Sequence, residues 1–271
     1  MIKPQNIRFT VDCRRHARAE RGLSLVELLV VIAVIAIIAA ILLPVVGSAK
    51  NQSAKATDLS NLHQIMMAEH VYLGDNQDVL TWPNWDYGGA MPNGVARPGW
   101  LYTINLSATS TTRFNAKAGL LWDSLHGGKS LLCPMDNPGE VYQNSNGKPS
   151  YRAMQLSSYI MNGAVMGFRT GYHSNSIPVR ASQMLPGDCI LFEADDSEAF
   201  SFNDGSSWPS EGISKRHSNG ATFAALDGSS SYVRDDDWSD DVDYPNRNRL
   251  WCYPLSDDGG DSVYGHVIPN E

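Results

Sequence analysis

The sequence predicts an α+β protein in which one long N-terminal helix packs on a head that contains an antiparallel β-sheet. Two observations carry this prediction. Residues 23–46 form an aliphatic run that only Ser24, Glu27 and Pro44 interrupt, which is the length of a membrane-spanning helix. After residue 75, strand patterns alternate with turn residues, so we expect the head to be built around a sheet.

The apolar run is long enough to cross a bilayer. At about 1.5 Å per residue, residues 23–46 make a helix of about 36 Å, against a hydrocarbon core of about 30 Å. The segment before it is basic, with Lys3, Arg8, Arg14, Arg15, Arg18 and Arg21 against Asp12 and Glu20. This bias predicts a cytoplasmic leader over 1–22 and an extracytoplasmic head over 75–271. Between them, the apolar run and the periodicity that follows it predict a long helix over 23–74.

Charge and cysteine content exclude some classes of protein. The net charge is −8 and becomes more negative without the basic leader, which argues against a nucleic-acid partner and leaves divalent cations open. Cys13 lies in the leader, so Cys133, Cys189 and Cys252 remain, and at most one disulfide can form among them. Because no C-x-x-C occurs, a structural zinc site is not expected.

Glu27 is the anomaly of the apolar run, because a carboxylate inside a membrane helix is costly unless it is paired. The stretch "RGLSLVE", the apolar run after it and Pro44 resemble the N-terminus of type IV pilins and of type II secretion pseudopilins. A plain membrane anchor with an accidental glutamate is the alternative. An ordinary secretory signal does not fit, since its apolar region is shorter.

The resemblance implies how the chain is processed and where it resides. A prepilin peptidase would cut after Gly22 and methylate the new N-terminal residue, Leu23, which stands where phenylalanine is commonest in the family. Glu27 and Pro44 would become residues 5 and 22 of the mature chain, as in the family pattern. The protein would then lie in the bacterial inner membrane, spanning it once, until it enters a filament.

The freed amine on Leu23 would lie one helical turn from Glu27. In the family, pairing of this acid with the amine of a neighbouring subunit is thought to set the register of the filament. Pro44 has no amide to donate to Ala40, so the helix is expected to kink or loosen over 40–47.

Beyond the span, apolar residues recur at spacings of three and four up to Leu73 and predict that an amphipathic helix continues onto the head. The residues expected on its wet side are Asn51, Lys55, Asp58 and Glu69. His63 and His70 are seven residues apart, and a solvated face is favoured over a metal site because no other ligands accompany them.

Tryptophans cluster in the stretch "TWPNWDYGGAMPNGVARPGW", which is expected to be an irregular loop. Trp82, Trp85 and Trp100 allow two interpretations. They stack on a sugar, or they cover a small core, which is the commoner case.

Three later stretches, "SLLCPMDNPG", "SSYIMNGAV" and "RHSNGATFAALDGSSSYV", resemble large pseudopilin-like proteins that carry an H-x9-DG signature. His217, Asp227 and Gly228 match its spacing. The signature also predicts a hairpin with strands over 221–226 and 229–233 and a two-residue turn at Asp227-Gly228.

This register would pair Phe223 with Tyr232 and Thr222 with Val233. Asp227 is then a turn residue. His217 is either a hydrogen-bonded anchor, which we favour, or half of a His/Asp metal or acid–base pair. Residues 188–195 are expected to form another, more buried strand.

Aspartates crowd the stretch "RDDDWSDDVDY". Calcium prefers such oxygen ligands, and type II secretion pseudopilins often hold calcium in a C-terminal loop. The candidate ligands are Asp235, Asp237, Asp240, Asp241 and Asp243. The spacing is not that of an EF-hand, so a solvated acidic loop is the favoured alternative and no cofactor is certain.

The resemblance implies a structural subunit, pilin or pseudopilin, of a type II secretion or type IV pilus-like filament. Its partners would be the prepilin peptidase, other subunits of the same or a different kind, and the inner membrane. It would not be an enzyme. The alternatives are a membrane-anchored adhesin that binds glycan through its tryptophans and a metal-dependent hydrolase that uses His217 and Asp227.

Overall fold

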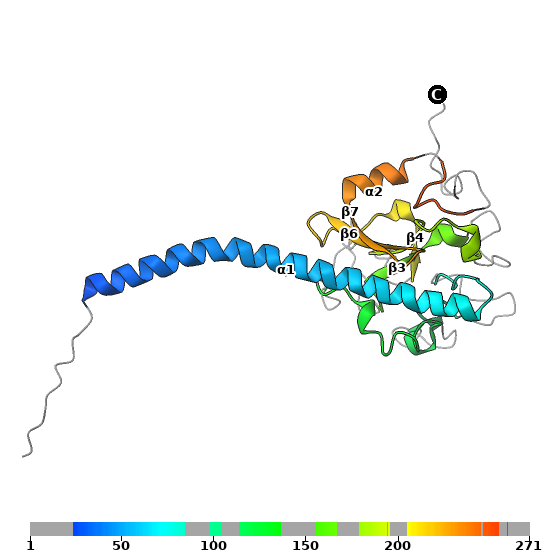
Figure 1. Ribbon diagram of the computed structural model, residues 1–271, viewed down its shortest axis with the longest axis horizontal. Coiled ribbons are helices and arrows are strands. Elements are labelled where there is room, and N and C mark those ends of the chain that lie inside the picture. Colours follow the sequence, from blue (N-terminus) through cyan, green and yellow to red (C-terminus); the bar gives the residue numbers. More distant parts are fainter. Residues whose placement is uncertain are drawn as a thin grey trace, which may run out of the picture. The chain divides into compact units, whose positions relative to one another are not determined.

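The computed structural model of the chain (Figure 1) has an α+β fold. It describes residues 24–84, 98–104, 114–136, 156–166, 179–193, 195, 205–244, 246–254 and 259. Internal contacts divide the chain into two units, Met1–Ser48 and Ala49–Glu271. The leader 1–22, with Cys13, and the residues Leu23 and Trp85 lie outside the described ranges.

Helix α1, Leu25–Asp75, is the long N-terminal helix that the sequence predicts. It remains helical through Pro44, so the helix does not loosen over 40–47, whereas the kink expected there stays a prediction. In the first unit, every large apolar side chain from Leu25 to Val46 is exposed, with exposed fractions between 48% and 79%. By length and composition the described residues contain one helix that could cross a membrane.

In the second unit the rest of α1 is amphipathic, as predicted. Its buried side chains follow a helical stripe of Ala54, Asp58, Asn61, Leu62, Ile65, Met66, Ala68, Glu69 and Leu73. The placement of Asp58 and Glu69 on the wet side is wrong, because both lie within this stripe at spacings of three and four and are fully buried. The head satisfies them: Glu69, for example, accepts hydrogen bonds of 2.7 Å from the backbone N and Oγ1 of Thr81.

The head is organised around a five-stranded sheet in the order β5-β3-β4-β6-β7. The strands are β3 Tyr159–Asn162, β4 Cys189–Glu193, β5 Ser206–Ser207, β6 Gly220–Ala225 and β7 Ser230–Arg234. All neighbours are antiparallel except β3 and β5, which are parallel. A separate pair joins β1 Thr103–Ile104 to β2 Phe114–Asn115.

Short 3₁₀ turns connect these strands, at Ala116–Ala118, Lys129–Leu131, Gly163–Met166, Ala181–Gln183 and Pro209–Glu211. Helix α2, Asp235–Val242, follows β7 directly.

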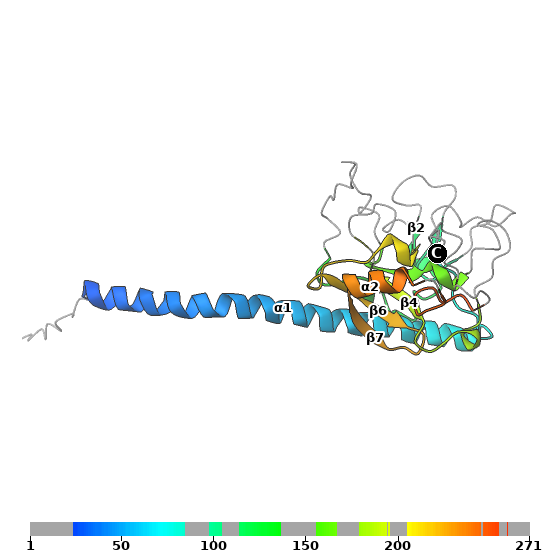
Figure 2. The ribbon, with the colours of Figure 1, turned by 90° about the horizontal axis from the view of Figure 1, so that it is seen from above.

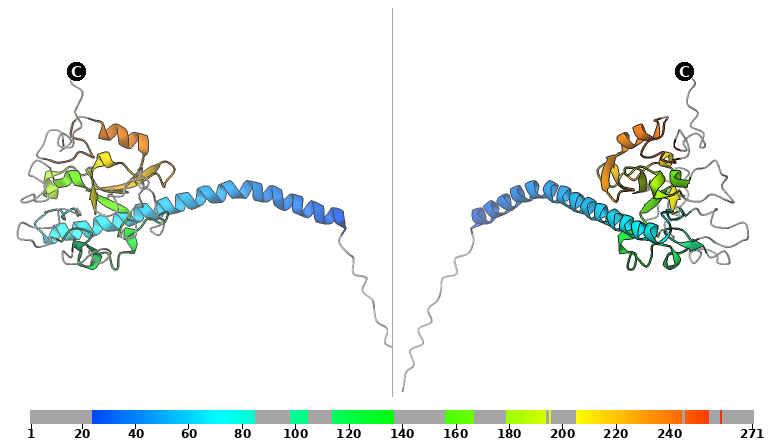
Figure 3. Two further views of the ribbon diagram at one scale, coloured as in Figure 1. Left: turned by 180° about the vertical axis from the view of Figure 1, so that it is seen from behind. Right: turned by 45° about the vertical axis from the view of Figure 1, so that its right-hand side comes forward.

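The two faces of the sheet meet different helices (Figures 1 and 2). Adjacent residues of a strand point to opposite faces, and β4 shows this clearly. Phe192 packs on Trp238 of α2, with ring centroids 4.9 Å apart, whereas Glu193 points to the face on which the second half of α1 lies. In Figure 3 the same layers are seen from behind, with α2 and α1 on either side of the strands.

The signature hairpin forms as β6 and β7, but the predicted register is wrong by one residue. Thr222 pairs with Tyr232, and Phe223 pairs with Ser231. The cause is a three-residue loop in place of the two-residue turn. The Gly228 N donates to Ala225 O at 3.0 Å, and Gly228 then takes a left-handed φ of 85°, as in a type I turn followed by a G1 bulge.

The aspartate-rich stretch is a helix rather than a loop. Acidic residues in the first turn of α2 face the positive end of its dipole. Three of its carboxylates also pair with cations of the head: Asp235 with Lys215, Asp237 with Arg234, and Asp241 with Arg249. Calcium binding by the five candidate aspartates stays a prediction.

Trp100 contradicts the sugar-stacking interpretation of the tryptophans. Its ring is 1% exposed, and its Nε1 donates to Gly205 O at 2.5 Å. Trp82 is half-buried. Trp100 therefore belongs to the core, whereas the sugar-stacking interpretation stays a prediction for Trp82.

Candidate functional site

The first candidate site is the start of α1, where Ser24 and Glu27 cap the helix reciprocally. The Ser24 backbone N donates to Glu27 Oε2 at 2.7 Å, and the Glu27 backbone N donates to Ser24 Oγ at 3.2 Å. This S-x-x-E arrangement is a capping box, which satisfies two donors that a helix start leaves open. The sequence analysis missed it, although the spacing of Ser24 and Glu27 is its signature.

The capping box changes the explanation of Glu27. The carboxylate is already paired within its own helix start before any cleavage exposes an amine. Removal of residues 1–22 would place a cationic amine beside this acid. Gly22 and Leu23, the predicted cleavage and methylation residues, lie outside the described ranges.

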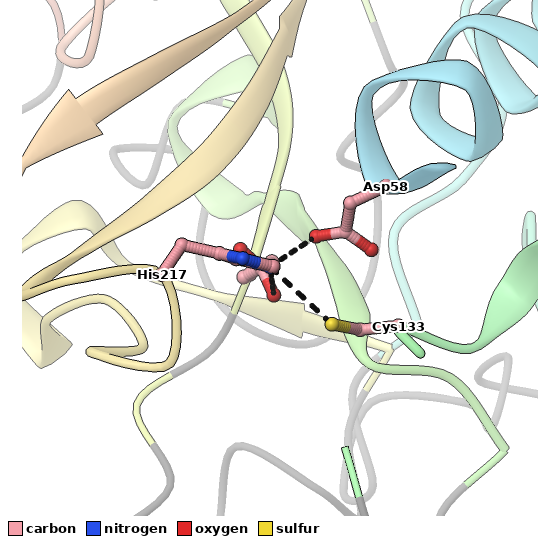
Figure 4. Close-up of side chains that lie close together, drawn as sticks. Asp58, Cys133 and His217 are labelled. Carbon is pink, nitrogen blue, oxygen red and sulfur yellow. Dashed lines mark hydrogen bonds and ion pairs between the residues drawn. The ribbon is translucent and has the colours of Figure 1, made fainter. Parts of the chain in front are cut away.

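The second candidate site is a group of four side chains in the head, which we call the buried cluster: Asp58, Cys133, Glu193 and His217. Their ligand atoms all lie within 4.8 Å of one another, and all four residues are buried. They come from α1, from the turn after Lys129–Leu131, from the end of β4 and from the turn before β6. Figure 4 shows His217 directed at both Asp58 and Cys133.

His217 is the centre of the buried cluster. Its Nε2 lies 3.0 Å from Asp58 Oδ2, 3.4 Å from Cys133 Sγ and 3.6 Å from Glu193 Oε1. A tight turn presents the ring: Ser218 and Asn219 both have positive φ, and the His217 backbone N donates to Gly220 O at 3.1 Å. The turn is thus centred on Ser218 and Asn219, directly before β6.

The two carboxylates are held by the strands beneath them. Tyr159 OH donates to Asp58 Oδ1. Thr222 Oγ1 lies 2.9 Å from Asp58 Oδ2 and 3.1 Å from Glu193 Oε2, so its single proton serves one of them at a time. The Thr222 backbone N donates to the same Glu193 oxygen at 2.8 Å.

Cys133 is fixed on the other side of the imidazole. Its backbone N donates to Ser158 Oγ at 2.9 Å, and its Sγ lies 3.4 Å from the Met135 backbone N. Arg216 brings a positive charge to the edge of the cluster, with Nη1 3.0 Å from Asp136 and 3.9 Å from Glu193 Oε1.

The protonation states follow from burial and these contacts. Burial lowers the pKa of His217, but hydrogen bonds with Asp58 and Cys133 and the nearby carboxylate of Glu193 outweigh it and raise the pKa to about 11. Burial raises the pKa of Asp58, yet bonds from His217, Tyr159 and Thr222 leave it below its usual value. Burial raises the pKa of the Cys133 thiol to about 11. Without a metal ion, the cluster therefore holds an imidazolium, a carboxylate and a thiol.

Nucleophilic catalysis is a poor match for this arrangement. A Cys–His pair reacts through a thiolate that substrate can reach, whereas Cys133 is 2% exposed and protonated. A groove of about 470 Å³ lies elsewhere, lined by Gln64, Met67, Ala68, Val71, Ser124, Leu125 and His126, none of which belongs to the cluster.

Asp227 does not join His217. Its carboxylate is exposed at the hairpin loop and accepts a bond of 2.9 Å from the Ser229 backbone N. The His/Asp pair required by the hydrolase alternative is therefore not formed. Asp227 makes the contact expected of a turn residue, and His217 makes those expected of a hydrogen-bonded anchor.

His63 and His70 of α1 bind the hairpin instead of facing water alone. His63 Nδ1 lies 2.9 Å from Gly228 O, and His70 Nε2 lies 2.7 Å from Leu226 O. Both ends of the H-x9-DG segment thus contact the same helix, His217 through Asp58 and the Asp-Gly loop through the two histidines.

Of the buried cluster, only His217 is a residue that the sequence pattern singles out. Asp58 was detectable, because it is an acidic residue at a stripe position between Ala54 and Leu62. Glu193 ends an apolar strand. The face of the sheet to which its side chain points cannot be predicted without knowing which strands pair with this one. Cys133, Cys189 and Cys252 are all buried free thiols.

A protein-family model, the prokaryotic N-terminal methylation motif, matches residues 17–43. No curated protein and no solved structure matches the chain. The match covers the predicted cleavage site, the capping box and most of the apolar run, and it supports a prepilin-type protein.

Proposed function

We propose that the chain is a structural subunit, pilin or pseudopilin, of an extracytoplasmic filament of the type IV pilus or type II secretion kind. The observation that carries the proposal is the coincidence of the methylation motif over 17–43 with a helix that begins at a Ser24–Glu27 capping box and leaves its large apolar side chains exposed to Val46. Such a surface needs lipid or neighbouring helices to cover it.

In this proposal, prepilin peptidase cleaves after Gly22 and methylates Leu23. The leader stays in the cytoplasm and the head is extracytoplasmic. The first half of α1 lies in the inner membrane and later among the helices of other subunits. The second half of α1 holds the head, so that the head moves with the filament core, and the polypeptide acts by assembly rather than by catalysis.

Glu27 would supply the register of assembly by pairing with the amine of a neighbouring subunit. A buried ion pair that fixes registry is a well-attested use of such a charge. The test is Glu27→Gln, because glutamine also serves in a capping box and the substitution removes only the negative charge.

The measurement is the fraction of the chain recovered in sheared filaments from cells that assemble them, with cleavage of the leader followed in parallel. We expect Glu27→Gln to be cleaved but to remain in the membrane fraction. Asp75→Asn, at an exposed position on the same helix, is the matched control and should assemble normally. Equal incorporation of Glu27→Gln would refute the role of this charge.

A further inference from the structure

We propose that Asp58, Cys133, Glu193 and His217 bind one Zn²⁺ or a chemically similar divalent transition-metal ion. Nothing in the filament proposal requires this site. It would be a structural centre that joins α1 to the sheet and to the H-x9-DG turn.

The geometry of the buried cluster suits a tetrahedral ion. With Zn–N and Zn–O bonds of about 2.0 to 2.1 Å and a Zn–S bond of about 2.3 Å, neighbouring ligand atoms lie about 3.3 to 3.6 Å apart. From His217 Nε2 the corresponding distances are 3.0, 3.4 and 3.6 Å. Small side-chain rotations would therefore be enough to form the coordination sphere.

The donor set selects the class of ion. One sulfur, one imidazole nitrogen and two carboxylates suit zinc and related transition ions. Calcium and magnesium take oxygen ligands, and calcium takes six to eight of them, so this cluster is distinct in chemistry from the aspartates of α2.

A second observation points to a ligand. Glu193 Oε1 is buried, and within the described residues it has no hydrogen-bond partner. It is also directed at the cluster, since it lies 3.6 Å from His217 Nε2. A buried carboxylate oxygen that lacks a hydrogen bond is costly, and coordination of a cation at this point would satisfy it.

The site would be structural rather than catalytic. Four protein ligands complete a tetrahedral zinc centre and leave no open position for water or substrate. The ligands come from four separate segments of the chain, so the ion would link parts that are distant in sequence. Binding would displace the proton of the His217 imidazolium and that of the Cys133 thiol, which leaves the net charge of the site unchanged.

The test is a Co²⁺ titration of the full-length chain in detergent, followed by absorption. Cobalt in a tetrahedral thiolate site gives a thiolate-to-metal charge-transfer band and intense visible bands. We expect one Co²⁺ per chain, with both features, and their loss when Zn²⁺ is added in equal amount.

Cys133→Ala is the decisive variant and Cys189→Ala its matched control, because Cys189 is equally buried but lies outside the cluster. Cys133→Ala should lose the charge-transfer band and weaken Co²⁺ binding by at least about tenfold, whereas Cys189→Ala should keep both.

Three results would overturn the proposal: no stoichiometric uptake by the wild-type chain, uptake without a thiolate band, or the same band in Cys133→Ala. The first two need no variant, so they decide the matter even if Cys133→Ala does not fold. The Co²⁺ titration is repeated on the Gly22→Ala chain, which should remain uncleaved. Because this variant keeps all four cluster residues, its Co²⁺ uptake tests the metal site independently of the filament proposal.

Discussion

Glu27 and Asp58 are two carboxylates on one helix, and they are satisfied in different ways. Glu27 is paired locally, by the backbone N of Ser24 three residues away. Asp58 is paired through the fold, by His217 and Tyr159, which lie 159 and 101 residues away. The first half of α1 is therefore a self-contained segment with an uncovered apolar surface, whereas the second half depends on the head.

The difference is consistent with the two tasks that the filament proposal assigns to this helix. An apolar segment whose one acid is already capped can leave one set of neighbours and join another, since within the described ranges its side chains make no long-range hydrogen bond. A segment whose acid lies in a buried network cannot move without exposing unpaired charges. The following predictions use this contrast, from the largest effect to the smallest.

Asp58→Asn should cost the most. It removes the main partner of a buried imidazolium, and breaking a buried ion pair on one side costs about 3 to 5 kcal/mol. We expect this loss in the free energy of unfolding of the full-length chain in detergent with chelator, measured by urea denaturation. The exposed control Asp75→Asn should change it by less than about 0.5 kcal/mol, and similar values for the two variants would contradict the network.

The His217–Asp58 pair should make the protein less stable both at alkaline pH and at acidic pH. Since folding raises the pKa of His217 from 6.5 to about 11, its contribution is complete below pH 6.5 and declines as the pH rises toward 11. Folding lowers the pKa of Asp58, so its contribution is present above about pH 3.8 and is lost in more acidic solution. Thermal midpoints of the chelated protein should fall on the alkaline side, and His217→Gln should flatten that fall.

Glu69 should act in the direction opposite to that of Asp58, so that stability falls as the pH rises. Burial raises its pKa to about 7 despite two hydrogen bonds from Thr81. The unfolded chain gives up this proton more readily, so stability should decline between about pH 4.5 and 7. Glu69→Gln is expected to remove the decline in stability between these pH values. A dependence of stability on pH identical to that of the wild type would exclude Glu69 as its cause.

His63→Ala and His70→Ala should have smaller effects, because each removes one hydrogen bond to a loop carbonyl. A loss of about 1 kcal/mol per variant is expected in urea unfolding. Hydrogen exchange should also show faster exchange at Gly228 and Ser229. Unchanged protection at those amides would argue against a role of the two histidines in holding the loop.

Calcium should have the smallest effect. Three of the five candidate aspartates already have cationic partners in the chain, so the thermal midpoint of the Cys133→Ala chain should be the same in calcium and in chelator. A saturable rise with calcium would restore the acidic stretch as a binding site.

The parts of the fold that depend on local pattern could be predicted from the sequence. The apolar run, the amphipathic stripe up to Leu73 and the strand–turn–strand of the signature all follow from periodicity and turn residues. The predictions that are wrong depend on contacts between distant residues or on the conformation of a single residue. Gly228 in a left-handed conformation adds one residue to the loop and shifts every cross-strand pair.

The buried cluster illustrates the same limit. Asp58 looks like a surface residue until the sheet covers its stripe, and Glu193 belongs to the site only because its neighbour Phe192 turns to the other face. The aspartates after β7 form a helix and not the expected loop, because the helix dipole and three cations of the head offset the repulsion between the carboxylates. Burial and pairing of these groups are properties of the assembled head.

The mass of the mature N-terminal peptide, after co-expression with a prepilin peptidase, tests the central claim most directly. The account predicts a chain that begins with N-methylated Leu23 in the wild type and an uncleaved chain for Gly22→Ala. Gly47→Ala, at a glycine with open space around it, should be cleaved like the wild type. An intact leader in the wild type, or a cut elsewhere, would contradict a prepilin-type subunit and reduce Glu27 to a helix cap.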